Sequence, residues 1–126
     1  MSPKTLADVA RMALAGDSFD RSLANFLDSF YARPIAEAWW EEPPGLSVTL
    51  GEVGHVQDAY LAATAEELAN KYNLPAPVWA RSPKRALRAP WFASSMRALR
   101  AVLLRESPPA FRARNLFVSE NALSRV

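Results

Sequence analysis

The strongest constraint on the fold of this chain is a stripe of apolar side chains between residues 19 and 31. Its members recur at i, i+4, i+7, i+8, i+11 and i+12 and are Phe19, Leu23, Phe26, Leu27, Phe30 and Tyr31. This spacing places all six on one face of a helix, and a face this apolar is normally buried. The stripe therefore predicts a helix that begins near Asp17 or Ser18 and turns this face into the core.

Weaker periodic patterns predict the other helices. Ser2 and Pro3 suit the cap and first turn of an N-terminal helix, and Gly16 suits its end. Further helices are predicted over residues 34–42, 57–72, 94–105 and 119–123, with a short turn around Phe111.

The helix predicted between Ser94 or Ser95 and Arg105 belongs to the arginine-rich part of the chain. Helical spacing predicts an inward apolar face, made of Met96, Leu99, Val102 and Leu103. Three arginines fall largely on the outward arc, and they are Arg97, Arg100 and Arg105.

Other segments are predicted to lie outside helices. Residues 46–56 have a strand-like composition, but two glycines and the shortness of the run favour a loop or at most a small hairpin. Residues 73–95 contain four prolines and are predicted to form an irregular connection, which aromatic side chains such as Trp79 and Trp91 fold onto the core. Residues 116–118 are predicted to be extended.

Length and composition favour one all-α domain. A chain of 126 residues suits a single domain, and half of its residues are apolar, which is enough to form a core. We therefore expect a single compact domain over residues 1–126, with five to six helices and a proline-rich central connection. There is no cysteine and no apolar run of the roughly twenty residues that a membrane span requires. These features predict a soluble, cytoplasmic protein that does not bind a membrane.

Charge is sorted along the chain. Residues 1–70 hold four basic and eleven acidic side chains, a net charge of −7, whereas residues 71–126 hold eleven basic and two acidic ones, a net charge of +9. A basic half attracts phosphate groups or an acidic protein surface. The sorting favours binding over catalysis as the function.

The basic half supplies the candidate contacts for an acidic partner. Arginine outnumbers lysine there by nine to two, and its planar guanidinium suits bidentate contacts with phosphate or carboxylate. The residues that we predict to contact nucleic acid or an acidic surface are Lys84, Arg85, Arg88, Arg97 and Arg100. Three interpretations remain open: a solvated or internally paired surface, a protein-binding surface and a nucleic-acid-binding surface.

Catalysis has little support in the sequence. His55 is the single histidine, and it lies in a glycine-flanked segment close to Asp58. A histidine beside an acid can act as a general base, but the sequence fixes no nucleophile next to it. No phosphate-binding glycine loop or metal-ligand spacing is present. We therefore expect no enzyme activity, no cofactor and no metal site.

Two adjacent tryptophans present a choice between core and surface. Trp39 and Trp40 are separated by about 100° on a helix, so that both can hardly face the same core. One of them is predicted to lie at the surface, where a large aromatic side chain often marks an interface, unless the loop after Pro44 covers it.

Several blocks of the chain together resemble a bacterial family of small helical proteins. These blocks are TLADVARMALAG, FDRSLANFLDSFY, DAYLAATAEELANKYNLPAPVWA, PWFAS and ESPPAFRARNLFVSENALSRV, and the most specific are residues 90–92 and 106–121. Proteins of this family are often catalogued as antitoxins or regulators encoded beside nucleotidyltransferase-type toxins, and some relatives carry an added helix-turn-helix domain. This chain shows no recognisable DNA-binding module.

The resemblance implies an antitoxin-like protein that binds a toxin of this type and neutralises it. The segment from residue 111 to 118 mixes aromatic, aliphatic and arginine side chains in the manner of interface hot spots. We therefore predict that the partner is bound by Phe111, Arg112, Arg114, Leu116, Phe117 and Val118. The alternative function is a transcriptional regulator that binds nucleic acid through its basic C-terminal half.

Overall fold

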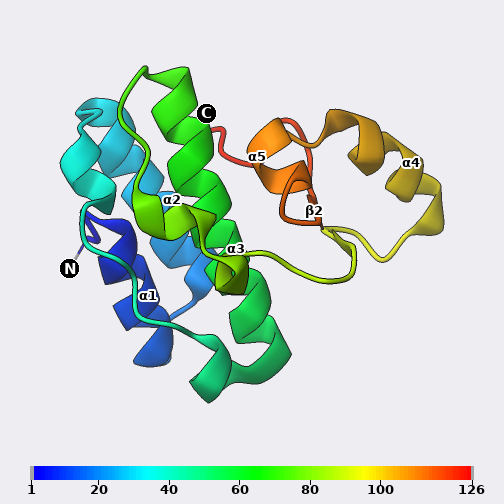
Figure 1. The fold of residues 1–126 in the computed structure, drawn as a ribbon, viewed down its shortest axis with the longest axis horizontal. Coiled ribbons are helices and arrows are strands. Elements are labelled where there is room, and N and C mark those ends of the chain that lie inside the picture. The colour runs from blue at the N-terminus through cyan, green and yellow to red at the C-terminus, as the bar shows by residue number, and fades with distance from the viewer. Residues whose placement is uncertain (1, 126) are drawn as a thin grey trace.

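The computed structural model describes residues 2–125, and three helices form its larger part (Figure 1). They are α1 (Leu6–Leu14), α2 (Phe19–Ala32) and α3 (Ser47–Lys71). The C-terminal elements form a smaller part beside α3. Helices dominate the described chain, and its two strands have two residues each, which confirms the predicted all-α class.

The first helix begins later than Ser2 and Pro3 predict. Thr5 is its N-cap, because the Thr5 Oγ1 accepts a hydrogen bond from the backbone N–H of Asp8 at 3.0 Å. The Asp8 carboxylate in turn accepts the backbone N–H of Thr5 at 3.3 Å. This reciprocal capping box satisfies two backbone donors and fixes the start of α1 at Leu6. Gly16 follows the end of the helix with a φ of +101°.

The predicted apolar stripe of α2 is confirmed. Ser18 caps the helix, and five of the six stripe residues are buried, with Tyr31 half-buried. Phe30 lies at the centre of an aromatic cluster, since its ring is 5.4 Å from that of Trp39 and 5.3 Å from that of Tyr72. These contacts join α2 to the segments on both sides of α3.

The prediction of a loop or hairpin at residues 46–56 is wrong, because these residues form the start of α3. The helix is kinked at Gly51, whose φ of +65° is a left-handed conformation that favours glycine. The Asp58 carboxylate accepts the backbone N–H groups of Leu46 at 2.9 Å and of Ser47 at 3.3 Å. A side chain twelve residues further along thus supplies acceptors for the first turn, which local sequence patterns do not reveal.

The proline-rich connection contains short 3-10 turns. Two of them lie in the connection itself, η2 (Val78–Arg81) and η3 (Pro83–Arg85). A similar turn, η1 (Ala36–Trp39), lies before α3. Trp79 packs against the core, and its indole N–H donates to the carbonyl oxygen of Trp39 at 2.8 Å. The irregular connection and its attachment through aromatic side chains are as predicted.

The C-terminal elements are arranged around a short parallel strand pair. Strand β1 (Trp91–Phe92) pairs with β2 (Leu116–Phe117), and between them lie α4 (Arg97–Glu106) and α5 (Pro109–Arg112). The predicted extended run at 116–118 thus includes β2. The predicted helix at 119–123 is wrong, because these residues form turns in which the Ser119 hydroxyl accepts the backbone N–H of Asn121.

The structure decides between the two alternatives for Trp39 and Trp40. Trp39 is fully buried and donates to the carbonyl oxygen of Pro75, whereas Trp40 is 67% exposed.

Within residues 2–125, no helix combines the length and the apolar character that crossing a bilayer requires.

Candidate interaction surface

Arg114, predicted to contact a partner, is instead buried and forms an ion pair inside the fold. Its side chain is 6% exposed, and its Nη2 lies 3.0 Å from the Glu66 carboxylate on α3. The same guanidinium donates to the carbonyl oxygens of Ala80 and Ala110 at 2.8 and 2.7 Å. A buried arginine with these partners joins α3, the central connection and α5, and offers nothing to another molecule.

Most of the other residues predicted for this partner site also lie inside the fold. Those buried with Arg114 are Phe111, Leu116, Phe117 and Val118. Phe111 packs edge-on against Tyr60 at 4.9 Å between ring centroids. Arg112 is exposed, although its Nη2 donates to the carbonyl oxygen of Ser107 at 2.7 Å. The apolar character of residues 111–118 therefore reflects the core, and Arg112 alone remains accessible.

Arg85, predicted to bind nucleic acid or an acidic surface, is buried too. Its Nη2 donates to the carbonyl oxygen of Pro43 at 2.6 Å, and its Nη1 lies 3.6 Å from the Asp58 carboxylate. The guanidinium also stacks over the ring of Trp79 at 5.0 Å. This prediction fails because the acidic half of the chain supplies the partner of Arg85.

The two halves thus neutralise each other in part. Besides Arg85 and Arg114, Arg125 forms an exposed ion pair with Asp28 of α2 at 3.0 Å. The basic side chains of the second half that have no ion pair within residues 2–125 are Lys71, Arg81, Lys84, Arg88, Arg97, Arg100, Arg105 and Arg112. Four of the five residues predicted for acidic contacts, all except Arg85, remain exposed.

Helix α4 carries the clearest unpartnered surface. The predicted inward residues Met96, Leu99 and Leu103 are spaced i, i+3 and i+7, but they differ in burial. Leu103 is 8% exposed, whereas Leu99 is 41% and Met96 is 61% exposed. The expectation that this whole face points inward is wrong, because α4 is held to the fold at its C-terminal end. We call Met96, which is the N-cap of α4, together with Leu99 and Leu103 the α4 stripe.

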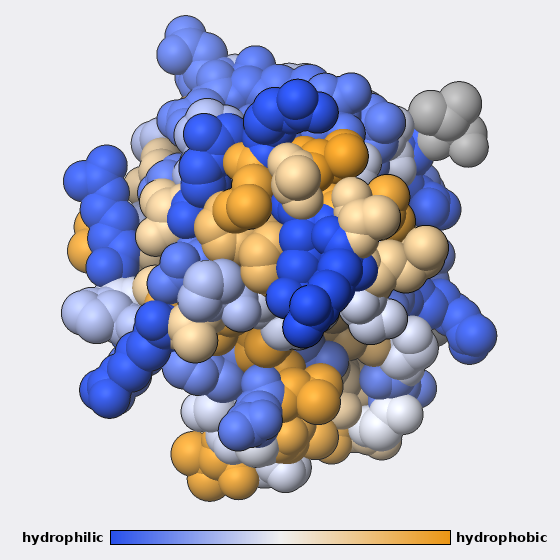
Figure 2. Space-filling model, turned by 90° about the vertical axis from the view of Figure 1, so that its right-hand side faces the viewer, coloured by the Kyte–Doolittle hydropathy of each residue, from blue (hydrophilic) through white to orange (hydrophobic). Residues whose placement is uncertain are grey.

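Arginines accompany the α4 stripe. Arg97 and Arg105 are exposed, and Arg100 lies over the ring of Phe92 at 5.1 Å from its centroid. Phe92 stacks in turn on Phe117 of β2, so that Arg100 is held in position. On the side of the molecule that carries α4, apolar patches lie next to strongly hydrophilic side chains (Figure 2). This mixture of apolar and arginine side chains suits a protein interface better than a purely electrostatic one.

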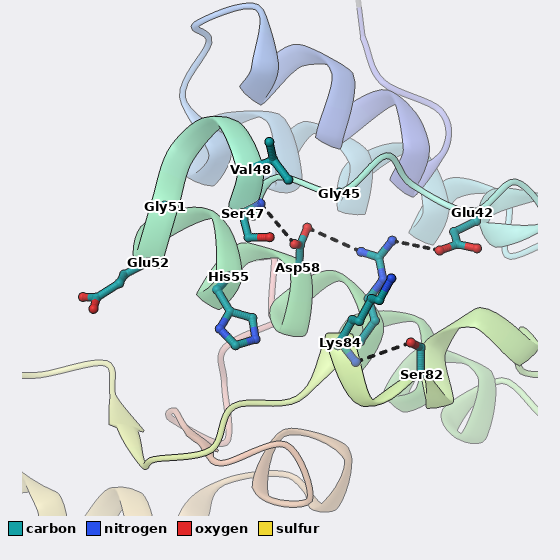
Figure 3. Close-up of a pocket in the computed structure, with 11 residues that line it drawn as sticks. Glu42, Gly45, Ser47, Val48, Gly51, Glu52, His55, Asp58, Ser82 and Lys84 are labelled. Atoms are coloured by element: carbon teal, nitrogen blue, oxygen red, sulfur yellow. Dashed lines mark hydrogen bonds and ion pairs between the residues drawn. The ribbon is translucent and has the colours of Figure 1, made fainter.

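The candidate catalytic pair does not form. His55 and Asp58 both line an open cavity of about 660 Å³ with residues such as Ser47 and Lys84. Asp58 points toward Ser47 and the Arg85 guanidinium, whereas the imidazole of His55 points away from it (Figure 3). The carboxylate that would orient a general base is therefore occupied by the cap of α3 and by Arg85.

Metal binding has no support at this cavity or elsewhere in the described chain. No group of three or more His, Asp or Glu side chains with metal-binding geometry occurs within residues 2–125.

No protein family, curated protein or solved structure matches this chain. The geometry of the exposed surface is therefore the main indication of its function.

Proposed function

We propose that this protein is a non-enzymatic binding protein and that α4 is the element that docks onto its protein partner. The observation that carries the proposal is the exposed part of the α4 stripe, because Met96 and Leu99 lie free beside Arg97 and Arg100. An exposed apolar helix face flanked by charges is the usual form of a helix that inserts into a groove of another protein. The flanking arginines favour a groove with an acidic rim.

The family resemblance gives this partner a chemical class. It suggests a nucleotidyltransferase-type toxin, made in the same cytoplasm and held inactive by an antitoxin-like chain. A nucleotidyltransferase needs clustered carboxylates to hold its metal ions, and a basic helix with an apolar face can cover such a site. The exposed guanidinium groups of Arg97 and Arg105 are available for this contact.

A capture experiment tests the proposal. The tagged wild-type chain and the variant Leu99→Glu are used to recover proteins from the native host, with washes at low and then high salt. We expect the wild type to retain a stoichiometric protein partner at high salt and the L99E variant to lose it. Val78→Glu is the matched control, because Val78 is also an exposed apolar side chain but lies on η2. Equal retention by L99E and wild type would contradict the proposal.

Nucleic-acid binding is the second candidate. It is supported by the exposure of Lys84, Arg88, Arg97 and Arg100, which all lie in the basic half. Phosphate contacts weaken steeply with salt, by roughly a thousandfold between 50 and 200 mM when six or more are formed. Nucleic acid recovered at low salt and lost at high salt, with no protein retained, would favour this function.

A further inference from the structure

A groove of about 410 Å³ lies where the start of α2 meets the first half of α3. Its walls are aromatic and aliphatic, because Phe19, Tyr60 and Trp91 line it together with the exposed Val53. Two carboxylates, Asp20 and Glu52, also line it. Neither forms an ion pair with any residue of the described chain. We call this site the acidic groove.

One buried polar atom of a residue beside the acidic groove lacks a partner. The side-chain carbonyl oxygen of Gln57, another lining residue, is buried and accepts no hydrogen bond from residues 2–125. A buried acceptor without a donor is unfavourable, and proteins rarely leave one unsatisfied. Because this oxygen is buried, the groove itself offers two carboxylates and three aromatic rings to a ligand.

These features select a cationic donor carried on an apolar segment. A guanidinium group suits them well, because it has five N–H donors, pairs with carboxylates and stacks on aromatic rings. Apolar side chains beside it would cover Val53 and the aromatic walls. Among the described elements, α4 has this composition, with Arg97 and Arg100 next to Met96 and Leu99.

The α4 of the same chain is not free to enter the groove. Before α4, the backbone N–H groups of Trp91 and Ala93 donate to Asn115 and Phe117 at 2.9 and 3.0 Å. After α4, the Ser107 hydroxyl accepts the backbone N–H of Val118 at 2.7 Å. Both ends of the segment are thus tied to the same C-terminal strand, and an occupant from outside is required.

We infer that the occupant is the α4 of a second copy of this chain. In the resulting reciprocal dimer, the α4 of each chain lies in the acidic groove of the other. Each chain then buries Met96 and Leu99 of its α4 stripe in the acidic groove of the other, and a two-fold arrangement closes the assembly. The sorted charge supports this pairing, because seven of the eight residues that line the groove belong to the acidic half and α4 belongs to the basic half. Self-association would also occupy the helix that the proposed function assigns to the partner protein.

A charge-swap experiment with the full chain tests the dimer. The mass of the purified protein is followed by sedimentation equilibrium at low ionic strength over a range of concentrations. We expect the wild type to approach twice the monomer mass. The groove variant Asp20→Arg/Glu52→Arg and the helix variant Arg97→Glu/Arg100→Glu are each expected to stay monomeric. Their equimolar mixture is expected to dimerise again, because each groove then meets a helix of opposite charge.

The controls separate this contact from general electrostatic effects. Glu37→Arg/Glu67→Arg carries the same change in charge at positions outside the groove, and this variant is expected to dimerise like the wild type. A wild type that stays monomeric, or a mixture of the two swapped variants that stays monomeric, would overturn the inference. Loss of the dimer in the control variant would overturn it too.

Failure of the inference is distinguishable from failure of the proposed function. The groove variant leaves α4 intact, so it is expected to capture the protein partner at least as well as the wild type while it fails to dimerise. The helix variant is expected to lose both interactions. Dimerisation is measured on the purified chain alone, so its result does not depend on whether a partner exists.

Discussion

At the scale of single residues, two buried arginines account for the largest difference between the predicted and the observed surface. Arg85 and Arg114 lie in an arginine-rich stretch, and composition alone cannot distinguish a buried arginine from an exposed one there. A buried charge is tolerated when it is paired and fully hydrogen-bonded. Glu66 meets this need for Arg114. Arg85 donates to the carbonyl oxygen of Pro43 and lies 3.6 Å from the Asp58 carboxylate, but its Nη1 has no hydrogen-bond partner within residues 2–125. Both acidic partners lie far away in sequence, so only the folded chain identifies the two arginines as internal.

Arg114→Met is predicted to lower the free energy of unfolding by about 3 kcal/mol, because removing one member of a buried pair leaves the other without its partner. The carbonyl oxygens of Ala80 and Ala110 lose a donor as well. Urea unfolding followed by tryptophan fluorescence measures the change. Arg112→Met is the control, with an expected loss within about 1 kcal/mol because its side chain is exposed. Equal losses in the two variants would show that the buried ion pair of Arg114 contributes no more stability than the exposed Arg112.

The pKa of the Tyr60 hydroxyl indicates how the free energy of unfolding changes at high pH. Burial raises the pKa of the Tyr60 hydroxyl from 10.0 to about 12, with a smaller contribution from the charge of Asp20. Between pH 10 and 12 the folded chain therefore keeps a proton that the unfolded chain releases, so the free energy of unfolding falls as the pH rises.

Urea unfolding of the wild type and of Tyr60→Phe across this pH range measures the effect. The Y60F variant is expected to show a shallower fall, because phenylalanine does not titrate. Some fall is expected to remain, since burial also raises the pKa of Tyr31. Parallel curves for the two proteins would contradict this role of Tyr60.

At the scale of elements, α3 and α4 show the limits of helical periodicity. The first turns of α3 carry valine, threonine and glycine, which favour strands or turns over helices. The turns form because Asp58 caps them and because Gly54 lets the backbone of Leu46 approach closely. In α4 the periodicity predicts a helix correctly, but it cannot show that the N-terminal part of the apolar face has no element to pack against.

Gly54→Ala is predicted to destabilise the protein by about 1–3 kcal/mol, the usual cost of overpacking. A Cβ at this position would lie 2.3 Å from the carbonyl oxygen of Leu46, so the first turn of α3 would have to move. The higher helix propensity of alanine opposes this effect by about 1 kcal/mol. Thermal unfolding followed by circular dichroism measures the outcome. Gly45→Ala is the control, because a Cβ there meets no atom within 4 Å. A more stable G54A chain would mean that the turn adapts freely.

At the scale of the whole molecule, the acidic and basic halves share one core. Phe111, Leu116 and Val118 of the basic half belong to the same buried cluster as Leu6 and Phe26 of the acidic half. The internal ion pairs of Arg85 and Arg114 cross the same boundary. The charge sorting therefore does not divide the chain into two separate folding units.

The chain is accordingly predicted to unfold in one cooperative transition. Urea unfolding followed by far-ultraviolet circular dichroism and by tryptophan fluorescence should give coincident curves, because helices and aromatic core are lost together. The fragment comprising residues 1–70 is expected to remain unfolded, since it lacks the core side chains of the second half. Two separated transitions, or a folded fragment, would contradict the shared core.

The sequence by itself determined the all-α class and the apolar face of α2. These features depend on periodicity and local geometry, which are encoded within a few turns of chain. Tertiary structure decided which arginines are paired, whether residues 111–118 lie in the core and which face of α4 stays open. These outcomes depend on contacts between residues distant in sequence, such as Glu66 with Arg114, and the same side chains suit a core and an interface equally well.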